Sequence, residues 1–264
     1  MNRHVVARGG SRSYLMAHKL SIIVPVYNEA QTIQQVLDRV DEIDLGGIEK
    51  EVIVIDDGST DGSARIIEER MGRAGTNRLA HLSIINLGKG AAIRFGFKHA
   101  TGDILMIQDA DLELDPAECT RLIAPILAGE ASVVYGSRFK QPSPGISART
   151  RWANRLLTWL TNILFGARLT DMETAYKVFR RDVLQAISLR CVGFDIEPEI
   201  TARVLQAGFR IRELPVAYNP RRKDEGKKIS WTDGIDAIYT LLRCRLIAQR
   251  GRPAAPARIA DVAS

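Results

Sequence analysis

Short apolar runs alternate with amphipathic segments through the first half of the chain. The runs are rich in Ile, Val and Leu, and we expect strands at 20–27, 51–57, 81–86 and 103–108. Continuous apolar runs of this length are typical of strands that a sheet buries on both faces. Between the runs, apolar residues recur at helical spacing, which predicts helices near 33–40, up to about 71 and from 88 to about 100. This alternation implies an α/β fold with a mostly parallel sheet and helices on both faces.

Polar or glycine-rich clusters directly follow all four predicted strands. They are Tyr27-Asn28-Glu29, Asp56-Asp57-Gly58-Ser59, Gly88-Lys89-Gly90 and Asp109-Ala110-Asp111. Any one of these clusters is explained as ordinary loop or helix-capping sequence. Open parallel sheets, however, bind ligands outside the carboxyl ends of their strands. Four clusters at one edge therefore predict a ligand-binding site there.

The last cluster contributes three carboxylates, Asp109, Asp111 and Glu113. Side chains alternate along an extended chain, so the three are expected to point the same way. No basic residue follows within the next several positions, and converging carboxylates need a hard cation between them. Mg²⁺ or Mn²⁺ is the natural occupant. A metal held in this way acts as a Lewis acid on a departing diphosphate, which predicts a nucleoside diphosphate as the leaving group.

Composition places the 264-residue chain among ordinary globular proteins, with 45% hydrophobic and 26% charged residues. The three cysteines, Cys119, Cys191 and Cys244, are widely spaced and include no CxxC pair. This pattern argues against a disulfide framework or a zinc site and suits a reducing cytosol. The longest uncharged stretch, residues 156–167, is shorter than the roughly 18 apolar residues that a membrane-spanning helix needs.

The net charge of +6 is concentrated in the last quarter of the chain. Residues 1–200 carry 24 basic and 25 acidic side chains, whereas residues 201–264 carry 13 basic and 6 acidic side chains. A local positive excess indicates an anionic partner such as a phosphate group or a membrane surface. Nucleic acid would also explain the charge, but it would leave the carboxylates without a role, so we expect no nucleic-acid partner.

Five segments resemble, in order, the GT-A glycosyltransferases of family 2: VPVYNE, VIDDGSTDG, LGKGAA, DADLELDP and GSRF. Three later segments narrow the resemblance to the dolichyl- or polyprenyl-phosphate hexosyltransferases, the phosphomannose- and phosphoglucose-lipid synthases: TDMETAYKVFRR, GFDIEPEI and RRKDEGKKISW. The similarity covers about residues 20–245. It implies a GT-A catalytic domain over 19–230 after a flexible leader at 1–18. A C-terminal amphipathic helix at 231–250 and a disordered tail at 251–264 are expected to follow.

The resemblance assigns the polar clusters to a nucleotide sugar. The residues that match nucleotide-binding positions of the family are Pro25, Tyr27, Glu29, Asp57, Lys89 and Asp109. Among them, Asp57 matches the residue that reads the base edge, and Lys89 opens a predicted helix where it can face a phosphate. The matching metal positions are Asp109, Asp111 and Glu113. Glu113 stands where mannosyltransferases often carry Gln, so UDP-glucose and GDP-mannose are both candidate donors.

The resemblance also implies a lipid phosphate as acceptor. A sugar hydroxyl acceptor needs a positioned general base, whereas a phosphate monoester with a second pKa of about 6 is already a charged nucleophile. Basic side chains would hold that phosphate, and the matching residues are Arg138, Arg151, Arg221 and Lys227. The predicted catalytic residues are Asp111, Arg138, Asp171 and Asp195. Asp171 and Asp195 would line the sugar pocket, cap a helix or pair with an arginine, and the family implies inversion at the anomeric carbon.

Residues 151–168 predict an amphipathic helix with arginines at both ends. One face carries Trp152, Leu156, Trp159, Leu160 and Ile163, and the opposite face carries Asn154, Thr158, Thr161 and Asn162. Such a helix either lies at a membrane interface or packs its apolar face on the protein's own sheet. Residues 235–247 are a second, weaker candidate. Relatives often carry C-terminal transmembrane helices, whereas here we expect attachment to be peripheral or through a separate membrane protein.

The sequence thus predicts an inverting, metal-dependent glycosyltransferase at the cytoplasmic, inner face of a membrane. It would move glucose or mannose from a UDP- or GDP-sugar to a polyprenyl phosphate, either dolichyl or undecaprenyl phosphate. One alternative is a family 2 transferase with a soluble or saccharide acceptor. This alternative would be favoured if activity depended on Asp195 or Glu197 as a general base. Another is a catalytically silent sugar-nucleotide-binding scaffold, against which the intact DADLE carboxylates argue. A nicotinamide-dependent dehydrogenase is not expected, because no GxGxxG follows the first predicted strand.

Overall fold

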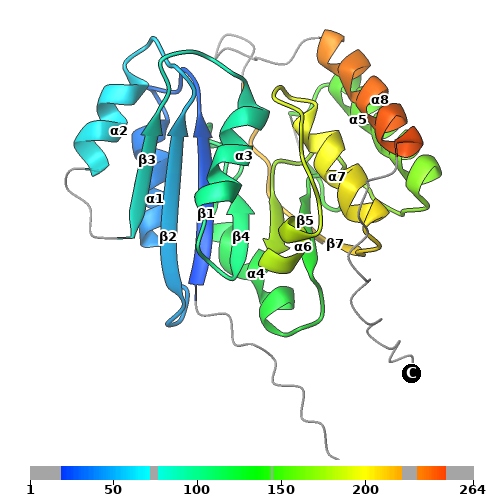
Figure 1. The fold of residues 1–264 in the computed structure, drawn as a ribbon, viewed down its shortest axis with the longest axis horizontal. Coiled ribbons are helices and arrows are strands. Elements are labelled where there is room, and N and C mark those ends of the chain that lie inside the picture. Colours follow the sequence, from blue (N-terminus) through cyan, green and yellow to red (C-terminus); the bar gives the residue numbers. More distant parts are fainter. Residues whose placement is uncertain (1–18, 72–76, 144, 222–230, 248–264) are drawn as a thin grey trace, which may run out of the picture.

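The computed structural model describes residues 19–71, 77–143, 145–221 and 231–247. Within these residues the strands form one seven-stranded sheet with the order β3-β2-β1-β4-β6-β5-β7 (Figure 1). The strands are β1 Lys19–Val26, β2 Glu49–Asp56, β3 Arg78–Leu82, β4 Ile104–Ile107, β5 Val133–Ser137, β6 Lys177–Arg180 and β7 Ile211–Pro215. All of them run in one direction except β6, which is antiparallel to its neighbours β4 and β5. The predicted mostly parallel sheet is therefore confirmed.

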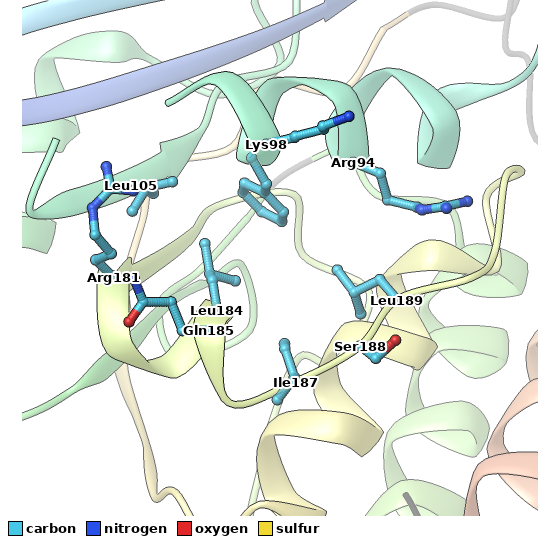
Figure 2. A pocket seen from close by; sticks show the side chains of 10 residues that line it. Arg94, Lys98, Leu105, Arg181, Leu184, Gln185, Ile187, Ser188 and Leu189 are labelled. Atoms are coloured by element: carbon cyan, nitrogen blue, oxygen red, sulfur yellow. The ribbon is translucent and has the colours of Figure 1, made fainter. Parts of the chain in front are cut away.

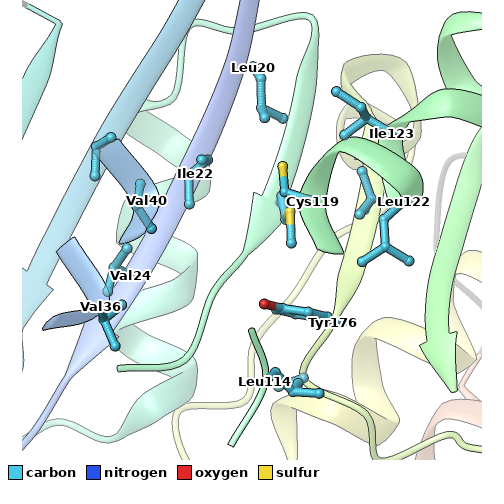
Figure 3. Packing of buried hydrophobic residues seen from close by; sticks show 14 of the residues in the cluster. Leu20, Ile22, Val24, Val36, Val40, Leu114, Cys119, Leu122, Ile123 and Tyr176 are labelled. Atoms are coloured by element: carbon cyan, nitrogen blue, oxygen red, sulfur yellow. The ribbon is translucent and has the colours of Figure 1, made fainter. Parts of the chain in front are cut away.

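Helices cover both faces of this sheet. They are α1 Ile33–Glu42, α2 Ser63–Met71, α3 Lys89–His99, the 3-10 helix η1 Pro116–Glu118, α4 Cys119–Leu127, α5 Ala148–Phe165, α6 Arg181–Gln185, α7 Ile196–Gln206 and α8 Trp231–Leu246. Along β1, Ile22 and Val24 pack with α1, α2 and α4, whereas Ile23 packs with α3 on the other face. Figure 3 shows Val36 and Val40 of α1 beside these β1 side chains. On the second face, α6 and α7 cover β5 and β6.

Two helices, α5 and α8, form an outer layer that packs on α7 (Figure 1). Leu157 of α5, Ala202 of α7 and Leu241 of α8 belong to one buried cluster. The hydroxyl oxygen of Ser147 caps the start of α5 by accepting a hydrogen bond from the Thr150 amide at 3.1 Å. Among the described residues, none of the helices combines the length and apolar character that crossing a membrane requires.

The polar face of α5 is buried, and much of its apolar face is exposed. Asn154 and Thr158 are 6% and 4% exposed, whereas Trp152 and Trp159 are 72% and 59% exposed. The side-chain amide of Asn154 donates a hydrogen bond to the Asp171 carboxylate at 3.1 Å, which explains why this side turns inward. The sequence leaves two packings open for this helix. The structure does not adopt the one in which the tryptophan face packs on the protein's own sheet.

The third strand differs from its sequence prediction. The sequence predicts a strand at 81–86, but β3 ends at Leu82. Ile84 is 98% exposed, so the apolar run continues as a loop instead of joining the core. Two backbone amides of this loop donate hydrogen bonds to the Asp57 carboxylate at 2.9 and 2.7 Å. A side chain from the end of another strand thus holds the loop, and the local pattern of apolar residues carries no sign of it.

The strand directions bring distant segments to one edge of the sheet, which we call the rim. The parallel strands all end at the rim, and the antiparallel strand β6 begins there. Lys177, the first residue of β6, pairs with Tyr135 near the end of β5. The segment that precedes β6 therefore joins the segments that follow β1, β2, β4, β5 and β7 at the rim.

Candidate active site

The three predicted metal-binding carboxylates, Asp109, Asp111 and Glu113, lie at the rim but do not converge. After β4 the chain turns at residues 110–111, and Leu112 has a φ of 59°, so this segment is not the extended chain that the prediction assumed. In the part of the chain that the structure describes, no three His, Cys, Asp or Glu side chains form a group that could hold a metal ion. Each carboxylate instead has its own cationic or hydrogen-donating partner.

Asp109 pairs with Lys89, the first residue of α3. The Lys89 Nζ atom lies 2.9 and 3.0 Å from the two carboxylate oxygens of Asp109 and 3.1 Å from Oε1 of Glu197. Glu197 in turn contacts Lys177, which is fully buried. Burial favours the neutral carboxyl, but Lys177 and Lys89 hold the pKa of Glu197 below its ordinary value. The four side chains form a row of alternating charges that leads from the rim into the core.

Arg221 ties the segment after β7 to the other two carboxylates. Its guanidinium lies 2.8 Å from Glu29 and 3.3 Å from Asp111. Its backbone amide donates to one oxygen of Glu113 at 3.0 Å, and the Tyr218 hydroxyl donates to the other at 3.0 Å. Both oxygens of Glu113 are thus committed within the protein.

Asp109 and Asp111 are the two predicted ligands that fit a divalent cation. Their side chains are 21% and 20% exposed, and Lys89 and Arg221 face them as cationic partners. Partly exposed carboxylate oxygens are hard donors of the kind that Mg²⁺ and Mn²⁺ take. Glu113 is held by neutral donors instead, since its two oxygens accept hydrogen bonds from the Tyr218 hydroxyl and the Arg221 amide.

Arg138 and Asp171 form a buried, bidentate ion pair just after β5. The Nε and Nη2 atoms of Arg138 donate to the carboxylate at 2.7 and 2.8 Å, and its backbone amide donates at 3.0 Å. Burial disfavours the charged guanidinium, but Asp171 keeps the pKa of Arg138 above its ordinary value. The Tyr218 ring centre lies 5.2 Å from Cζ of Arg138. Asp171 is fully buried and orients Arg138 through these hydrogen bonds. The sequence left three roles open for Asp171, and pairing with an arginine is the one that the structure shows.

The predicted nucleoside-binding residues follow two adjacent strands, β1 and β2. Tyr27 and Glu29 are half-buried, whereas Pro25 is buried inside β1 and shapes the strand. Asp57 holds the loop before α3 through the two hydrogen bonds described above. Gly58 permits this close approach, because a Cβ atom there would lie 2.6 Å from a backbone carbon of that loop. The structure therefore brings Tyr27, Glu29 and Asp57 to the rim.

Three other predicted residues are not brought into these contacts. Arg151 lies in the first turn of α5 and makes no ion pair with another described residue. Asp195 precedes α7, and its carboxylate accepts a hydrogen bond from Thr240 of α8 at 3.2 Å, so it faces α8. Lys227 lies outside the described residues.

The structure adds three residues that the sequence analysis does not single out, Glu173, Lys177 and Tyr218. Oε1 of Glu173 is buried and has no hydrogen-bond partner among the described residues. Burial raises the pKa of Glu173 to about 7, with Lys177 opposing the rise. A signal for Glu173 was available, because the TDMET segment that contains Asp171 carries this second carboxylate two residues later.

A separate cavity of about 330 Å³ lies between α3 and α6. Figure 2 shows Arg94 and Lys98 on α3, with Leu184 and Leu189 across the cavity and Arg181 at its side. Its described lining contains no carboxylate and none of the predicted site residues. The rim, and not this cavity, therefore holds the candidate chemistry.

Comparison with known proteins places the chain in a family. Residues 21–188 match the family model described as Glycosyl transferase family 2. The chain therefore belongs to glycosyl transferase family 2, as the resemblance of its motifs predicts.

Two relatives are undecaprenyl-phosphate 4-deoxy-4-formamido-L-arabinose transferases. The chain is 31% identical over 233 residues to the protein from Klebsiella pneumoniae subsp. pneumoniae, a match that covers 88% of this chain and 69% of the relative. It is 30% identical over 229 residues to the protein from Pseudomonas fluorescens, a match that covers 86% of this chain and 64% of the relative. The chain thus spans about two thirds of the length of these relatives.

Solved structures share the fold. The crystal structure of glucosyl-3-phosphoglycerate synthase from Mycobacterium tuberculosis with phosphoglyceric acid has a TM-score of 0.66 and 22% identity, and the match covers 89% of this chain and 82% of that chain. A structure of the same enzyme with Mn²⁺, uridine diphosphate and phosphoglyceric acid has a TM-score of 0.65 and 23% identity, covering 89% and 81%. These likenesses confirm the GT-A fold predicted for the chain.

Proposed function

We propose that this chain is an inverting glycosyltransferase that moves a hexose from a UDP- or GDP-sugar to polyprenyl phosphate. The observation that carries the proposal is a set of three cations at the rim, Lys89, Arg138 and Arg221, beside two partly exposed carboxylates. Such a set suits a reaction in which both substrates carry phosphate. The relatives named as undecaprenyl-phosphate transferases support the same class of acceptor.

Asp109 and Asp111 are the residues that hold Mg²⁺ or Mn²⁺ in this proposal, and the related fold crystallised with Mn²⁺ and uridine diphosphate supports it. When bound, such a cation supplies Lewis-acid stabilisation of the departing diphosphate. Lys89 and Arg221 neutralise the same two carboxylates in the structure described here. If Asp109 and Asp111 held a metal ion instead, the side chains of Lys89 and Arg221 would be available to phosphate oxygens. Glu113 accepts a hydrogen bond from the Arg221 amide and so holds the segment that carries Arg221.

Arg138 orients the acceptor phosphate. Asp171 holds one edge of its guanidinium and Tyr218 lies beside it, which leaves the remaining N–H groups for an anion. The acceptor phosphate is ionised at neutral pH and needs no general base. One of its oxygens forms a bond to the anomeric carbon while the bond to the diphosphate breaks, and the electron pair leaves with the diphosphate. Attack opposite to the leaving group inverts the anomeric centre.

The contacts of Asp195 and Glu197 favour this acceptor over a saccharide hydroxyl. A hydroxyl acceptor needs a general base within hydrogen-bond reach. Glu197 lies between Lys89 and Lys177, which keep it ionised and occupied. Asp195 faces Thr240 of α8. Neither of the two bases that the sequence analysis considered is therefore poised to take a proton at the rim.

The α5–α8 surface is the site of membrane contact in this proposal, at the cytoplasmic face. We define this surface by its exposed apolar side chains, Trp152, Leu156, Trp159, Ile163, Ile235, Tyr239, Leu242 and Leu246. Arg149, Arg155 and Arg245 are exposed on the same two helices. Tryptophan on an apolar face with nearby arginines is typical of helices that lie in the headgroup region of an anionic bilayer. Asn154 connects this layer to the rim through Asp171.

The test is a transfer assay with three radiolabelled donors, UDP-glucose, GDP-mannose and UDP-4-deoxy-4-formamido-L-arabinose. Each is incubated with the full chain and Mg²⁺ or Mn²⁺, with and without polyprenyl phosphate. We expect UDP-glucose or GDP-mannose to place label in the organic phase, and only when polyprenyl phosphate is present. Label only from the formamido-arabinose donor would contradict the proposed hexose. Label that stays in the aqueous phase with every donor would contradict the acceptor.

A further inference from the structure

Glu173 is a carboxyl group at the rim for which the roles described above leave no function. Its Oε1 atom is buried and has no hydrogen-bond partner among the described residues, although the residue as a whole remains partly exposed. A buried polar group without a partner loses its hydration without compensation. Native structures contain few such groups, and one that faces a substrate site is explained when the substrate supplies the partner.

The backbone on both sides of Glu173 is fixed. The Met172 amide donates a hydrogen bond to Oγ1 of Thr158 at 3.1 Å, and the Thr174 hydroxyl donates to the carbonyl oxygen of Gly136 at 2.6 Å. Met172 and Thr174 are both fully buried. These contacts fix the backbone position from which the Glu173 side chain extends.

The charged groups around Glu173 are already paired with each other. On one side Arg138 donates two hydrogen bonds to Asp171, and on the other Lys177 contacts Glu197. The charges of these same four groups also shift the pKa of Glu173. Neither cation donates a hydrogen bond to Oε1 of Glu173, so this atom stays without a partner beside two ion pairs.

We propose that Glu173 binds hydroxyl groups of the sugar that is transferred and thereby helps to select that sugar. The inference rests on the nucleotide-sugar donor of the proposed function. A carboxylate repels the diphosphate of the donor and the phosphate of the acceptor, which Lys89, Arg138 and Arg221 attract instead. The sugar is the uncharged part of the substrates between these phosphates, and its hydroxyls offer the donors that a carboxylate lacks.

The protonation of Glu173 is compatible with this contact at neutral pH. Burial raises its pKa to about 7, so ionised and protonated forms are both populated there. An ionised carboxylate accepts hydrogen bonds, and a protonated carboxyl both donates and accepts. A sugar hydroxyl can do both, so either form of Glu173 can pair with it. An ionised phosphate oxygen, in contrast, only accepts hydrogen bonds, so it could pair with the protonated form of Glu173 alone.

Titration calorimetry on the full chain tests the inference by separating sugar from nucleotide. The probes are UDP against UDP-glucose, UDP against UDP-4-deoxy-4-formamido-L-arabinose, and GDP against GDP-mannose. We expect Glu173→Ala to bind the free nucleoside diphosphate as the wild-type chain does. The same variant should bind the preferred nucleotide sugar ~10- to 100-fold more weakly, which is the effect of losing a charged hydrogen bond. Glu173→Gln, which keeps an acceptor oxygen, should recover part of the loss.

Glu130→Gln is the matched control, because its carboxylate is exposed and pairs with Arg212 away from the rim. Unchanged sugar binding in Glu173→Ala, equal loss for nucleotide and nucleotide sugar, or a wild-type chain that gains no affinity from any sugar would each overturn the inference. Normal donor binding with lost turnover would overturn it as well, because Glu173 would then act on a proton. Transfer of label to lipid by the wild-type chain tests the acceptor separately, so the two failures are distinguishable.

Discussion

Charged side chains at the rim find partners inside the protein, whereas large apolar side chains on the α5–α8 surface remain in water. At the rim, Asp109 and Asp111 each face a cation. On the α5–α8 surface, Trp152 and Trp159 are mostly exposed. A monomeric protein rarely leaves a large apolar patch on its surface unless it meets a partner there. The two regions therefore differ in the kind of partner that each can take, and our proposal assigns the charged substrates to the rim and the lipid to the α5–α8 surface.

Helix α5 belongs to both regions. Its buried polar face reaches the rim, where Asn154 bonds to Asp171 and Asp171 holds Arg138. Its exposed face carries the two tryptophans of the α5–α8 surface. Its buried side combines Leu157 with Asn154, Thr158 and Thr161, so polar side chains of this helix are buried while both tryptophans are exposed. This arrangement places Arg138, to which we assign the acceptor phosphate in our proposal, within a few contacts of the surface that we propose to meet the membrane.

The largest expected effect is at the rim. Asp111→Asn should lower turnover ~1,000-fold, because it removes the charge of one of the two carboxylates that would hold the cation in our proposal. Its side chain is 20% exposed, so the melting temperature should stay close to that of the wild-type chain. Transfer rates with and without a chelator measure the change, and Asp38→Asn on α1 is a control with the same chemistry. Full activity of the wild-type chain in excess chelator would contradict the metal assignment.

Lys177→Met should lower the free energy of unfolding by about 3 kcal/mol, because it leaves Glu197 buried with one cation fewer. Urea unfolding followed by circular dichroism measures the effect. Lys140→Met, at a partly exposed lysine, should change the unfolding free energy by no more than about 0.5 kcal/mol. If both variants unfolded at the same urea concentration, the charges at the rim would not form the coupled row described here.

Glu173→Gln should change how stability depends on pH. The pKa of Glu173 lies at about 7 in the folded chain, above its ordinary value of 4.5. The folded state thus keeps the proton longer, so this contribution to stability is present below pH 4.5 and is lost as the pH rises through 7. Glutamine does not ionise, so the variant should gain about 2 kcal/mol over the wild-type chain between pH 5 and pH 8. Parallel unfolding curves at all pH values would show that the carboxyl is not desolvated.

The smallest expected effect is at the α5–α8 surface. Replacing Trp152 and Trp159 with Glu should weaken binding to anionic vesicles about tenfold, because apolar area no longer enters the bilayer. Their exposure predicts that the fold is kept. Vesicle flotation and circular dichroism measure the two properties. Leu157→Glu, at a buried position of the same helix, should unfold the layer instead. Unfolding of the tryptophan variant would show that this face belongs to the core.

Local pattern predicted the α/β sheet and its first helices because those elements depend on residues that are neighbours in sequence. The strands β1, β2 and β4 are continuous apolar runs, and the periodicity of α1 matches its buried side. The same method placed a strand at 81–86, but β3 ends at Leu82 and the chain continues as a loop held by Asp57. It also gave no sign that β6 runs antiparallel and so brings Lys177 and Glu173 to the rim.

The motifs single out residues that lie at the rim, but they do not give the contacts that these residues make. The motifs located Asp109, Asp111 and Arg138, but their partners come from distant parts of the chain. Arg221 and Glu29, for example, are separated by 192 positions and lie 2.8 Å apart. The left-handed Leu112 redirects the carboxylates that were expected to converge. Such features depend on tertiary structure, which spacing and composition do not encode.

The most direct test of the division between rim and surface uses one reaction with two acceptors. The wild-type chain and the Trp152→Glu, Trp159→Glu variant would be given a long-chain polyprenyl phosphate in vesicles and a short, water-soluble prenyl phosphate. We predict that the variant loses most transfer to the vesicle acceptor and retains transfer to the soluble one. Equal loss on both acceptors, or no loss on either, would contradict the account.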